Sequence, residues 1–276
     1  MQFNFTKMHG LGNDFVVING IDQSISLSPK QIKFIADRHF GIGCDQLLLV
    51  EKSEDKRADF RYRIFNANGE EVEQCGNGAR CFAVFVRDEG LTDKTEIPVI
   101  TKTGRIVLKV EENNQVTVNM GVPELQPENI PFLAKKQADS YTLDIDGKAV
   151  TLSAVSMGNP HAVILVDDVE NAPVAELGQK IQKDPSFPNS VNVGFMQIID
   201  RNNIRLRVYE RGVGETQACG TGACAAVVAG RIRKLLGEKV TVNLPGGNLS
   251  IHWAGGQNPV MMTGATASVF KGTISF

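Results

Sequence analysis

Two cysteines, Cys75 and Cys219, stand in nearly the same motif, Cys-Gly-x-Gly-Ala, and small apolar residues follow each motif. A helix that begins at such a motif presents unpaired N–H groups and a positive dipole end, which favour an anion. The same forces lower the pKa of a thiol from about 8.5 towards neutrality. Glycines let a ligand approach the backbone closely. Two opposed thiols could take a proton from one face of a carbon and return one to the other face, which inverts a stereocentre.

Zinc, redox and nucleotide chemistry fit these motifs less well. Cys75 and Cys81 are six positions apart and Cys219 and Cys224 are five apart, which matches neither the C-x₂₋₄-C of structural zinc nor the redox C-x-x-C. A P-loop would place Lys-Ser/Thr after the glycines. A hydrolase with one cysteine nucleophile would need a histidine relay rather than a symmetric pair. Binding of some other anion stays open.

The other candidate residues have simpler interpretations when each is taken alone. Cys44, Cys81 and Cys224 are expected to be buried packing residues, because a thiol usually acts as a small hydrophobe. Asn13 is typical of a turn, and Arg211 beside Glu210 is typical of a surface ion pair. Single histidines are expected to be packing residues, and the chain has four: His9, His39, His161 and His252.

The two cysteine motifs belong to a longer internal repeat. A shift of 144 residues (219 − 75) places Phe60–Ala79 on Ile204–Ala223. Two further matches follow in the same order, at shifts of 146 and 143: Leu11–Ile18 on Met157–Leu165, and Gly104–Gly121 on Gly247–Gly264. Three ordered matches with such small changes of offset indicate two duplicated domains.

The repeat predicts the elements that position the cysteines. FRYRIF and IRLRVY alternate apolar with charged residues, as half-buried strands do. The apolar stretches 79–90 and 223–237 are helix-length and end in glycine, and the second is expected to be buried. The predicted fold is α+β, with two pseudo-symmetric domains, each a curved and mostly antiparallel sheet around a central helix.

We expect one domain at residues 1–120 and the other at 121–264, with the active site in a cleft between them. The segment YTLDIDGKAVTL precedes the second repeat and has almost no counterpart before the first. The C-terminal tail, residues 265–276, is therefore expected to complete the sheet of the first domain.

The composition argues against several classes of binding partner and location. A net charge of −2 and a pI near 6.1 give no basic surface that would indicate nucleic acid. No apolar run approaches the roughly 20 residues of a membrane span, and the N-terminus lacks the features of a signal peptide. Five cysteines cannot all pair within the chain, which favours a reduced, cytoplasmic setting.

Six motifs also resemble the diaminopimelate epimerase family, in order and over nearly the whole chain: MHGLGNDFVV, GIGCDQLL, EEVEQCGNGARC, MGNPHAV, FPNSVNVGF and ERGVGETQACGTGAC. The resemblance implies a homodimeric isomerase that interconverts LL- and meso-2,6-diaminopimelate for lysine and peptidoglycan precursor synthesis. It implies a two-base mechanism with no cofactor and, in particular, without pyridoxal phosphate; the cysteine spacings separately argue against a metal.

The same resemblance assigns site residues by matching positions. Cys75 and Cys219 would be the acid/base pair, and His161 and Glu210 would tune the pKa of the thiols. The implied substrate contacts are Asn13, Gln46, Asn66, Gly76, Asn77, Asn159, Asn192, Glu210, Arg211, Gly220 and Thr221. Phe270 replaces a tyrosine that the family usually has near its dimer contacts, which puts one hydrogen bond in doubt. Asn68 stands where aspartate is common, and either residue suits a turn.

Three alternatives remain. A proline-racemase-like enzyme would share the two-domain structure, although Glu210 and Arg211 favour a substrate with a charged distal end. The other two are a non-catalytic amino-acid-binding protein and a thiol redox sensor that uses Cys75 and Cys219.

Overall fold

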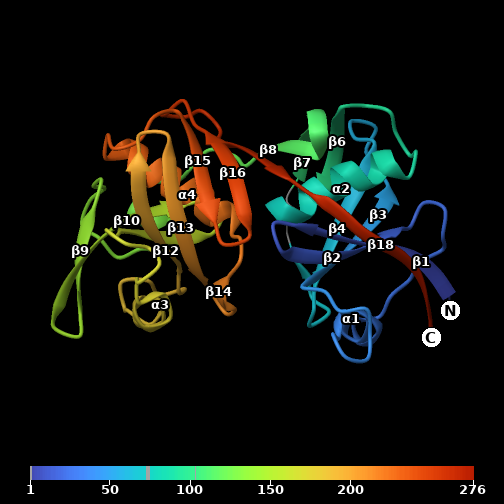
Figure 1. Ribbon diagram of the computed structural model, residues 1–276, viewed down its shortest axis with the longest axis horizontal. Coiled ribbons are helices and arrows are strands. Elements are labelled where there is room, and N and C mark those ends of the chain that lie inside the picture. Colours follow the sequence, from blue (N-terminus) through green and yellow to red (C-terminus); the bar gives the residue numbers. More distant parts are fainter. Residues whose placement is uncertain (1, 73–74, 103) are drawn as a thin grey trace. The chain divides into compact units, whose positions relative to one another are not determined.

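The structure is a computed structural model that describes residues 2–72, 75–102 and 104–276. The chain forms two compact units (Figure 1). Unit 1 comprises Met1–Asn119 with Thr263–Phe276, and unit 2 comprises Met120–Met262. These bounds lie within two residues of the expected ones. In the described ranges, no helix is long and apolar enough to cross a membrane.

Unit 1 is a sheet in the order β18-β1-β2-β3-β4-β6-β7-β8, in which β2–β3 and β4–β6 are parallel and the other pairs are antiparallel. A short strand, β5, pairs antiparallel with the C-terminal part of β4. Its elements are β1 (Gln2–Gly10), β2 (Asn13–Asn19), α1 (Pro29–Ala36), β3 (Gln46–Lys52), β4 (Phe60–Asn66), β5 (Glu71–Val72), α2 (Gly76–Asp88), β6 (Glu96–Thr101), β7 (Gly104–Val110), the 3₁₀ turn η1 (Glu112–Asn114), β8 (Gln115–Asn119) and β18 (Ala267–Ser275).

Unit 2 repeats this topology in the order β9-β10-β11-β12-β13-β15-β16, with β11–β12 and β13–β15 as the parallel pairs. Its elements are η2 (Pro127–Asn129), β9 (Tyr141–Ile145), β10 (Lys148–Ser156), β11 (Pro160–Leu165), α3 (Val174–Gln182), β12 (Asn192–Asp200), β13 (Asn203–Glu210), β14 (Gly214–Thr216), α4 (Gly220–Ile232), β15 (Lys239–Leu244) and β16 (Gly247–His252). The strand β17 (Met261–Ala265) crosses from unit 2 into unit 1, where it pairs with β8.

The C-terminal strand β18 has the place in unit 1 that β9 has in unit 2. It pairs antiparallel with β1 along nearly its whole length, as β9 pairs with β10, and in Figure 1 its red ribbon lies beside the blue β1. The predicted α+β class and its duplication are confirmed by this topology and by the relatives described below.

Each unit buries one central helix against its sheet. The helix α2 contacts β1, β2, β3, β7 and β8, and α4 contacts β10, β11, β12, β13 and β16. Ten residues of α4 are buried, as its Ala- and Val-rich sequence predicts. Both helices begin at the cysteine motif, as expected, at Gly76 and Gly220, which is three residues before the apolar stretches, and both end before the predicted glycines.

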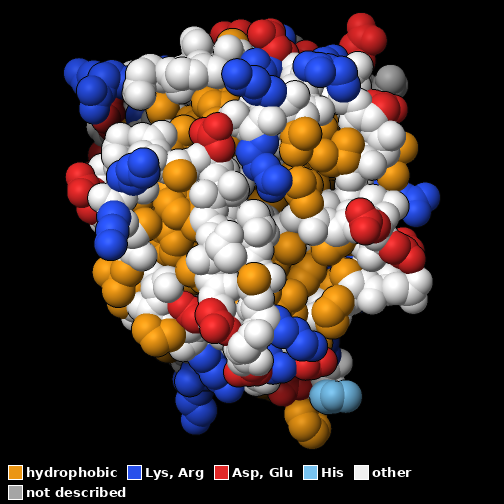
Figure 2. Space-filling model, turned by 90° about the vertical axis from the view of Figure 1, so that its left-hand side faces the viewer, with side chains coloured by type: hydrophobic (Ala, Val, Ile, Leu, Met, Phe, Trp, Pro, Cys, Tyr) orange, Lys and Arg blue, Asp and Glu red, His pale blue; other side chains and the backbone are white. Residues whose placement is uncertain are grey.

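Charges are distributed without a dominant sign. Figure 2 shows one face on which acidic and basic side chains are interspersed, with apolar side chains between them. This agrees with the near-zero net charge of the chain.

Candidate active site

Cys75 occupies the N-cap position of α2. Its backbone is extended (φ −138°, ψ 122°), and its carbonyl accepts the first helical bond from the Ala79 N–H at 2.8 Å. The Tyr62 hydroxyl donates to the same carbonyl at 3.4 Å. The helix can begin here because Gly78 has no side chain: a Cβ would lie 2.7 Å from the Tyr62 oxygen. The Cys75 side chain is half-buried.

Asn13 reaches Cys75 from the β1–β2 hairpin. Leu11 and Gly12 have positive φ values of 56° and 86°, and Gly10 pairs with Asn13 across this tight turn, as primed hairpin turns require. The Cys75 thiol donates to Asn13 Oδ1 at 3.6 Å, and Asn77 Nδ2 donates to the same oxygen at 3.2 Å. The predicted residues Asn13, Cys75 and Asn77 are therefore in contact.

Gln46 and Asn66 lie directly opposite each other, where β3 begins and β4 ends. The side-chain amide of Gln46 donates to Asn66 Oδ1 at 2.8 Å. Because β2 and β3 are parallel and β3 and β4 antiparallel, this pair shares one end of the sheet with Asn13. These neutral amides can orient a polar ligand by hydrogen bonds, but they cannot balance its charge.

Cys219 occupies the matching N-cap position of α4 in unit 2. It is 4% exposed, and its sulfur lies 3.6 Å from Thr221 Oγ1. Burial raises the pKa of Cys219 well above its ordinary value, and the carboxylate of Glu210 raises that pKa further. The Thr221 hydroxyl and the Gly222 N–H act in the opposite direction but do not outweigh burial. Cys219 is therefore a thiol at neutral pH.

Glu210 ends β13, as Asn66 ends β4. The Thr216 hydroxyl donates to Glu210 Oε1 and holds the carboxylate in place. Thr216 was not among the predicted site residues. Thr216 stands three positions before Cys219 within the motif ERGVGETQACGTGAC, so the sequence alone could have identified it as a candidate.

Asn159, Thr221 and His161 form a chain of side-chain contacts. Asn159 Nδ2 donates to Thr221 Oγ1 at 3.4 Å, and His161 Nε2 lies 3.0 Å from Asn159 Oδ1. Burial, together with the charge of Arg211, lowers the pKa of His161 to about 3. The ring is therefore neutral, and its Nε2–H donates to the Asn159 oxygen.

Asn192 holds the start of the segment that carries Arg211. Its amide donates to the Pro160 carbonyl at 3.0 Å and accepts the Arg211 N–H at 2.9 Å. The Arg211 guanidinium is exposed and donates through Nη1 to the Asn189 carbonyl at 3.0 Å. A planar guanidinium in this position can bind a carboxylate.

The remaining predictions have mixed outcomes. Cys44, Cys81 and Cys224 are buried, as expected, and burial raises the pKa of Cys44 and of Cys81 to about 12. The prediction that His39 and His252 are packing residues is wrong, because both are exposed on the surface. Isolated histidines carry no periodic signal that would distinguish a loop or strand surface from the core.

Comparison with known proteins identifies relatives over the whole chain. The family profile described as Diaminopimelate epimerase matches residues 5–126 and 153–269. A diaminopimelate epimerase of Thioalkalivibrio sulfidiphilus is 62% identical over 276 residues, and one of Teredinibacter turnerae is 58% identical over 274 residues. Both alignments cover 99% of this chain and 99% of the relative.

Solved structures with the same fold are more distant in sequence. A phenazine biosynthesis protein of the PhzF family from Bacillus anthracis has a TM-score of 0.73 at 17% identity, and the alignment covers 100% of each chain. A probable proline racemase from Agrobacterium radiobacter has a TM-score of 0.69 at 14% identity, over 99% of this chain and 92% of the other. These likenesses concern the fold alone. The profile match and the full-length identities of 58% and 62% show that the chain belongs to the diaminopimelate epimerase family.

Proposed function

We propose that the chain interconverts LL-2,6-diaminopimelate and meso-2,6-diaminopimelate without a cofactor, with Cys75 and Cys219 as its two acid/base residues. The observation that carries the proposal is the duplication of one arrangement. In each unit, a cysteine of a Cys-Gly-x-Gly motif caps the N-terminus of the buried central helix. Two equivalent proton-transfer groups are what inversion of a stereocentre requires.

In the proposed reaction, the thiolate of one cysteine removes the α-proton from one face of the substrate. The thiol of the other cysteine delivers its proton to the opposite face, so that one proton is lost and one gained. The amides of Gly76, Asn77, Gly220 and Thr221 would bind the adjacent carboxylate at the two helix N-termini. These donors would stabilise the negative charge that develops on the carboxylate as the proton leaves. The roles of the cysteines exchange in the reverse direction.

The charged residues of unit 2 suit the two ends of this substrate. Glu210 can pair with an ammonium group, which would also reduce its effect on the pKa of Cys219. Arg211 can bind the distal carboxylate in a bidentate manner. Proline has no distal charged group, so these two residues support diaminopimelate over a proline-racemase reaction. Asn13, Gln46, Asn66, Asn159 and Asn192 would orient the substrate, and His161 would act through Asn159.

Proton exchange provides the direct test. Reduced protein is incubated with LL-diaminopimelate in D₂O, without added cofactor, and both α-protons are followed by NMR. We expect exchange at one stereocentre and formation of the meso product. Cys75→Ala and Cys219→Ala should each lower turnover by at least about a thousandfold while the fold is retained. Near-normal turnover in either variant would refute the two-base assignment.

Cys224→Ala is the matched control, because Cys224 is a buried cysteine of the same helix, α4, but lies outside the proposed site. This variant should retain the exchange reaction with a modest loss of stability. No exchange by the folded, reduced wild-type protein would instead favour the binding or redox alternatives.

We also propose that the enzyme is a cytoplasmic homodimer that acts in lysine and peptidoglycan precursor synthesis. The apolar side chains of Val269 and Phe270 are 57% and 48% exposed on β18, which supports an interface there. The Phe270 ring packs edge-on against Phe5, with centroids 5.9 Å apart, so apolar packing persists without the tyrosine hydroxyl. Light scattering of the purified protein would give a mass near 60 kDa, about twice that of the 30.0 kDa chain; a monomer at micromolar concentration would contradict the proposal.

A further inference from the structure

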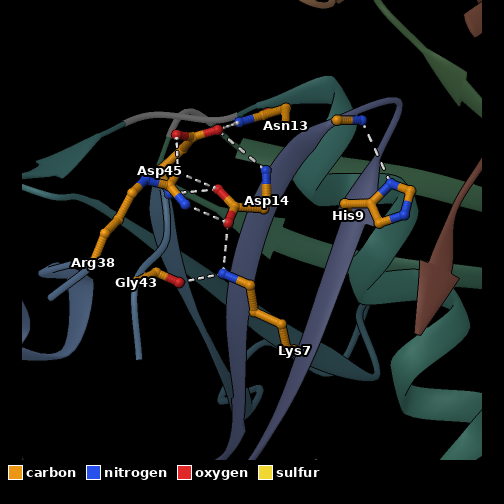
Figure 3. Close-up of polar contacts among 8 residues, drawn as sticks. Lys7, His9, Asn13, Asp14, Arg38, Gly43 and Asp45 are labelled. Carbon is orange, nitrogen blue, oxygen red and sulfur yellow. Dashed lines mark hydrogen bonds and ion pairs between the residues drawn. The ribbon is translucent and has the colours of Figure 1, made fainter. Parts of the chain in front are cut away.

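A network of charged side chains in unit 1 leads to Asn13 (Figure 3). It begins at Lys7 and Arg38, passes through Asp14 and Asp45, and ends at the Asn13 carboxamide. Asp45 belongs to the motif GIGCDQLL, in which only the next residue, Gln46, was assigned to the substrate. Nothing in the proposed reaction so far requires this aspartate.

The parallel pairing of β2 with β3 brings the two aspartates together. Phe15 and Gln46 are register partners, so the residues before them, Asp14 and Asp45, lie side by side. The Asp45 N–H donates to Asp14 Oδ1 at 2.9 Å, and the Asp14 N–H donates to Asp45 Oδ2 at 3.1 Å. Each carboxylate is thus fixed by the backbone of the other residue.

Two cations balance this pair of carboxylates. Arg38 donates to Asp14 through two nitrogens, at 3.0 and 2.8 Å, and to Asp45 Oδ1 at 2.8 Å. Lys7 donates to Asp14 and to the Gly43 carbonyl. Burial raises the pKa of Asp14, but hydrogen bonds from Arg38 and Lys7 outweigh it and hold that pKa well below its usual range. Asp14 is therefore a fixed anion that helps to anchor Arg38 beside Asp45.

The remaining contact of Asp45 sets the direction of the Asn13 carboxamide. Asp45 Oδ2 lies 2.9 Å from Asn13 Nδ2, and an ionised carboxylate can only accept. The NH₂ end of the carboxamide must therefore face Asp45. Its oxygen then faces the opposite side, where the Cys75 thiol and the Asn77 amide donate to it.

We infer that Asp45 is a positioning residue for the proposed epimerase: it holds the oxygen of the Asn13 carboxamide, rather than its NH₂ group, against the sulfur of Cys75. A hydrogen-bond acceptor at this position stabilises the thiol relative to the thiolate. Donation by Nδ2 to an anion also polarises the amide and makes its oxygen a stronger acceptor. Cys75 is thereby favoured as the thiol, and the Asn13 oxygen fixes the direction of its S–H bond, which suits the proton donor of the two-base reaction. The role in turnover rests on the proposed function, whereas the orientation of Asn13 does not.

Other titratable groups surround the network. Burial raises the pKa of Tyr62 well above its usual value and that of Cys81 to about 12, so both stay protonated at neutral pH. The hydrogen bonds that Arg38 donates to Asp14 raise the pKa of Arg38 further above its ordinary value. Lys7 faces Asp14, and His9 contacts the turn through the Gly12 N–H rather than the carboxamide.

Asp45→Asn tests the inference, because it keeps the size of the side chain but adds an NH₂ group. The new amide can meet Asn13 in either orientation, so the Asn13 oxygen is no longer held against Cys75. We expect turnover to fall about 10–100-fold. The rate of Cys75 alkylation by iodoacetamide is measured without substrate, by peptide mass spectrometry over a range of pH. The midpoint of this pH dependence should lie at least about 0.5 pH unit lower in Asp45→Asn than in the wild type.

Two variants distinguish positioning from a merely structural role. Asp55→Asn, the matched control, removes the bidentate contact with Arg57 elsewhere in unit 1 and should change neither quantity. Arg38→Gln keeps the Asp45 carboxylate but removes its cation. It should therefore lower the melting temperature and leave the midpoint of Cys75 alkylation nearly unchanged. If Asp45→Asn does not fold, Asp45→Ala replaces it, with the same expected shift.

The outcomes are distinct. A lower midpoint with reduced turnover supports the inference. An unchanged or higher midpoint overturns it, even if turnover falls together with the melting temperature, because Asp45 would then act only on the fold. A wild-type protein without diaminopimelate exchange would refute the proposed function, but the alkylation midpoint, measured without substrate, would still decide the orientation of Asn13.

Discussion

Arg207 and Glu215 form a two-bonded ion pair between β13 and β14, with Nε–Oε1 and Nη2–Oε2 distances of 2.6 and 3.0 Å. Arg63 and Glu71 form the same pair between β4 and β5 in unit 1, at 2.9 and 2.8 Å. In both units the glutamate stands four residues before the motif cysteine. The duplication has therefore kept a brace on the strand that leads to each helix N-terminus, as well as the cysteine itself.

Glu215→Gln should weaken this brace in unit 2. Arg207 is mostly buried and also donates to the carbonyls of Val169 and Glu170, so it cannot move freely to another partner. We expect the free energy of unfolding, measured in urea, to fall by roughly 1–2 kcal/mol, which is more than a simple surface pair contributes. Asp59→Asn, which removes the pair with the exposed Lys94, should change it by less than about 0.5 kcal/mol. Equal effects of the two substitutions would argue against the brace.

His161 should make stability depend on pH below neutrality. Its pKa is about 3 in the folded protein and about 6.5 when unfolded, so the unfolded chain binds the extra proton first. This contribution to stability is complete above about pH 6.5 and is lost as pH falls towards 3. Between pH 7 and 5 the wild type should lose about 2 kcal/mol more than His161→Gln.

Urea unfolding at the two pH values measures this difference. His252→Gln, which alters an exposed histidine, should follow the wild type at both. If His161→Gln showed the same loss between pH 7 and 5 as the wild type, His161 would have to be protonated in the folded protein.

The sequence predicted the parts of the fold that have a local pattern. FRYRIF and IRLRVY became β4 and β13, since alternation reports a half-buried strand. The apolar stretches begin three residues after the helices do, because glycine disfavours helix, yet Gly78 and Gly222 are helical and neighbouring side chains crowd the place that a Cβ would take. Asp45 was missed for a different reason. Its contact with Asn13 spans 32 positions and depends on the parallel pairing of β2 with β3, which no local pattern reports.

Removal of residues 269–276 should destabilise unit 1 selectively. It would delete most of the β18 pairing with β1, the ring contact between Phe5 and Phe270, and the ion pair between Lys271 and Glu89. The exposed edge of β1 would then carry unpaired backbone groups. Hydrogen exchange should accelerate in β1 and β2, while β9 and β10 keep their protection. Unchanged thermal unfolding after the truncation would contradict the structural role of β18.

Oxidation should inactivate the enzyme reversibly if Cys75 and Cys219 face the same substrate carbon. Peroxide would convert the half-buried Cys75 thiol to a sulfenic acid and release water. Attack by the Cys219 sulfur would then form a disulfide and release a second water. Burial keeps the pKa of Cys44 and of Cys81 near 12. Peroxide should therefore oxidise these two thiols far more slowly than Cys75.

We therefore expect peroxide to abolish turnover, dithiothreitol to restore it, and mass spectrometry to identify a peptide pair joined through Cys75 and Cys219. Cys219→Ser removes the second sulfur and should leave Cys75 as a sulfenic or sulfinic acid without the cross-link. Because a disulfide needs the two Cα atoms within about 7 Å, the cross-link would also measure how closely the two units can bring their helix N-termini together. Oxidised protein that retained full turnover would mean that at least one of the two thiols takes no part in proton transfer.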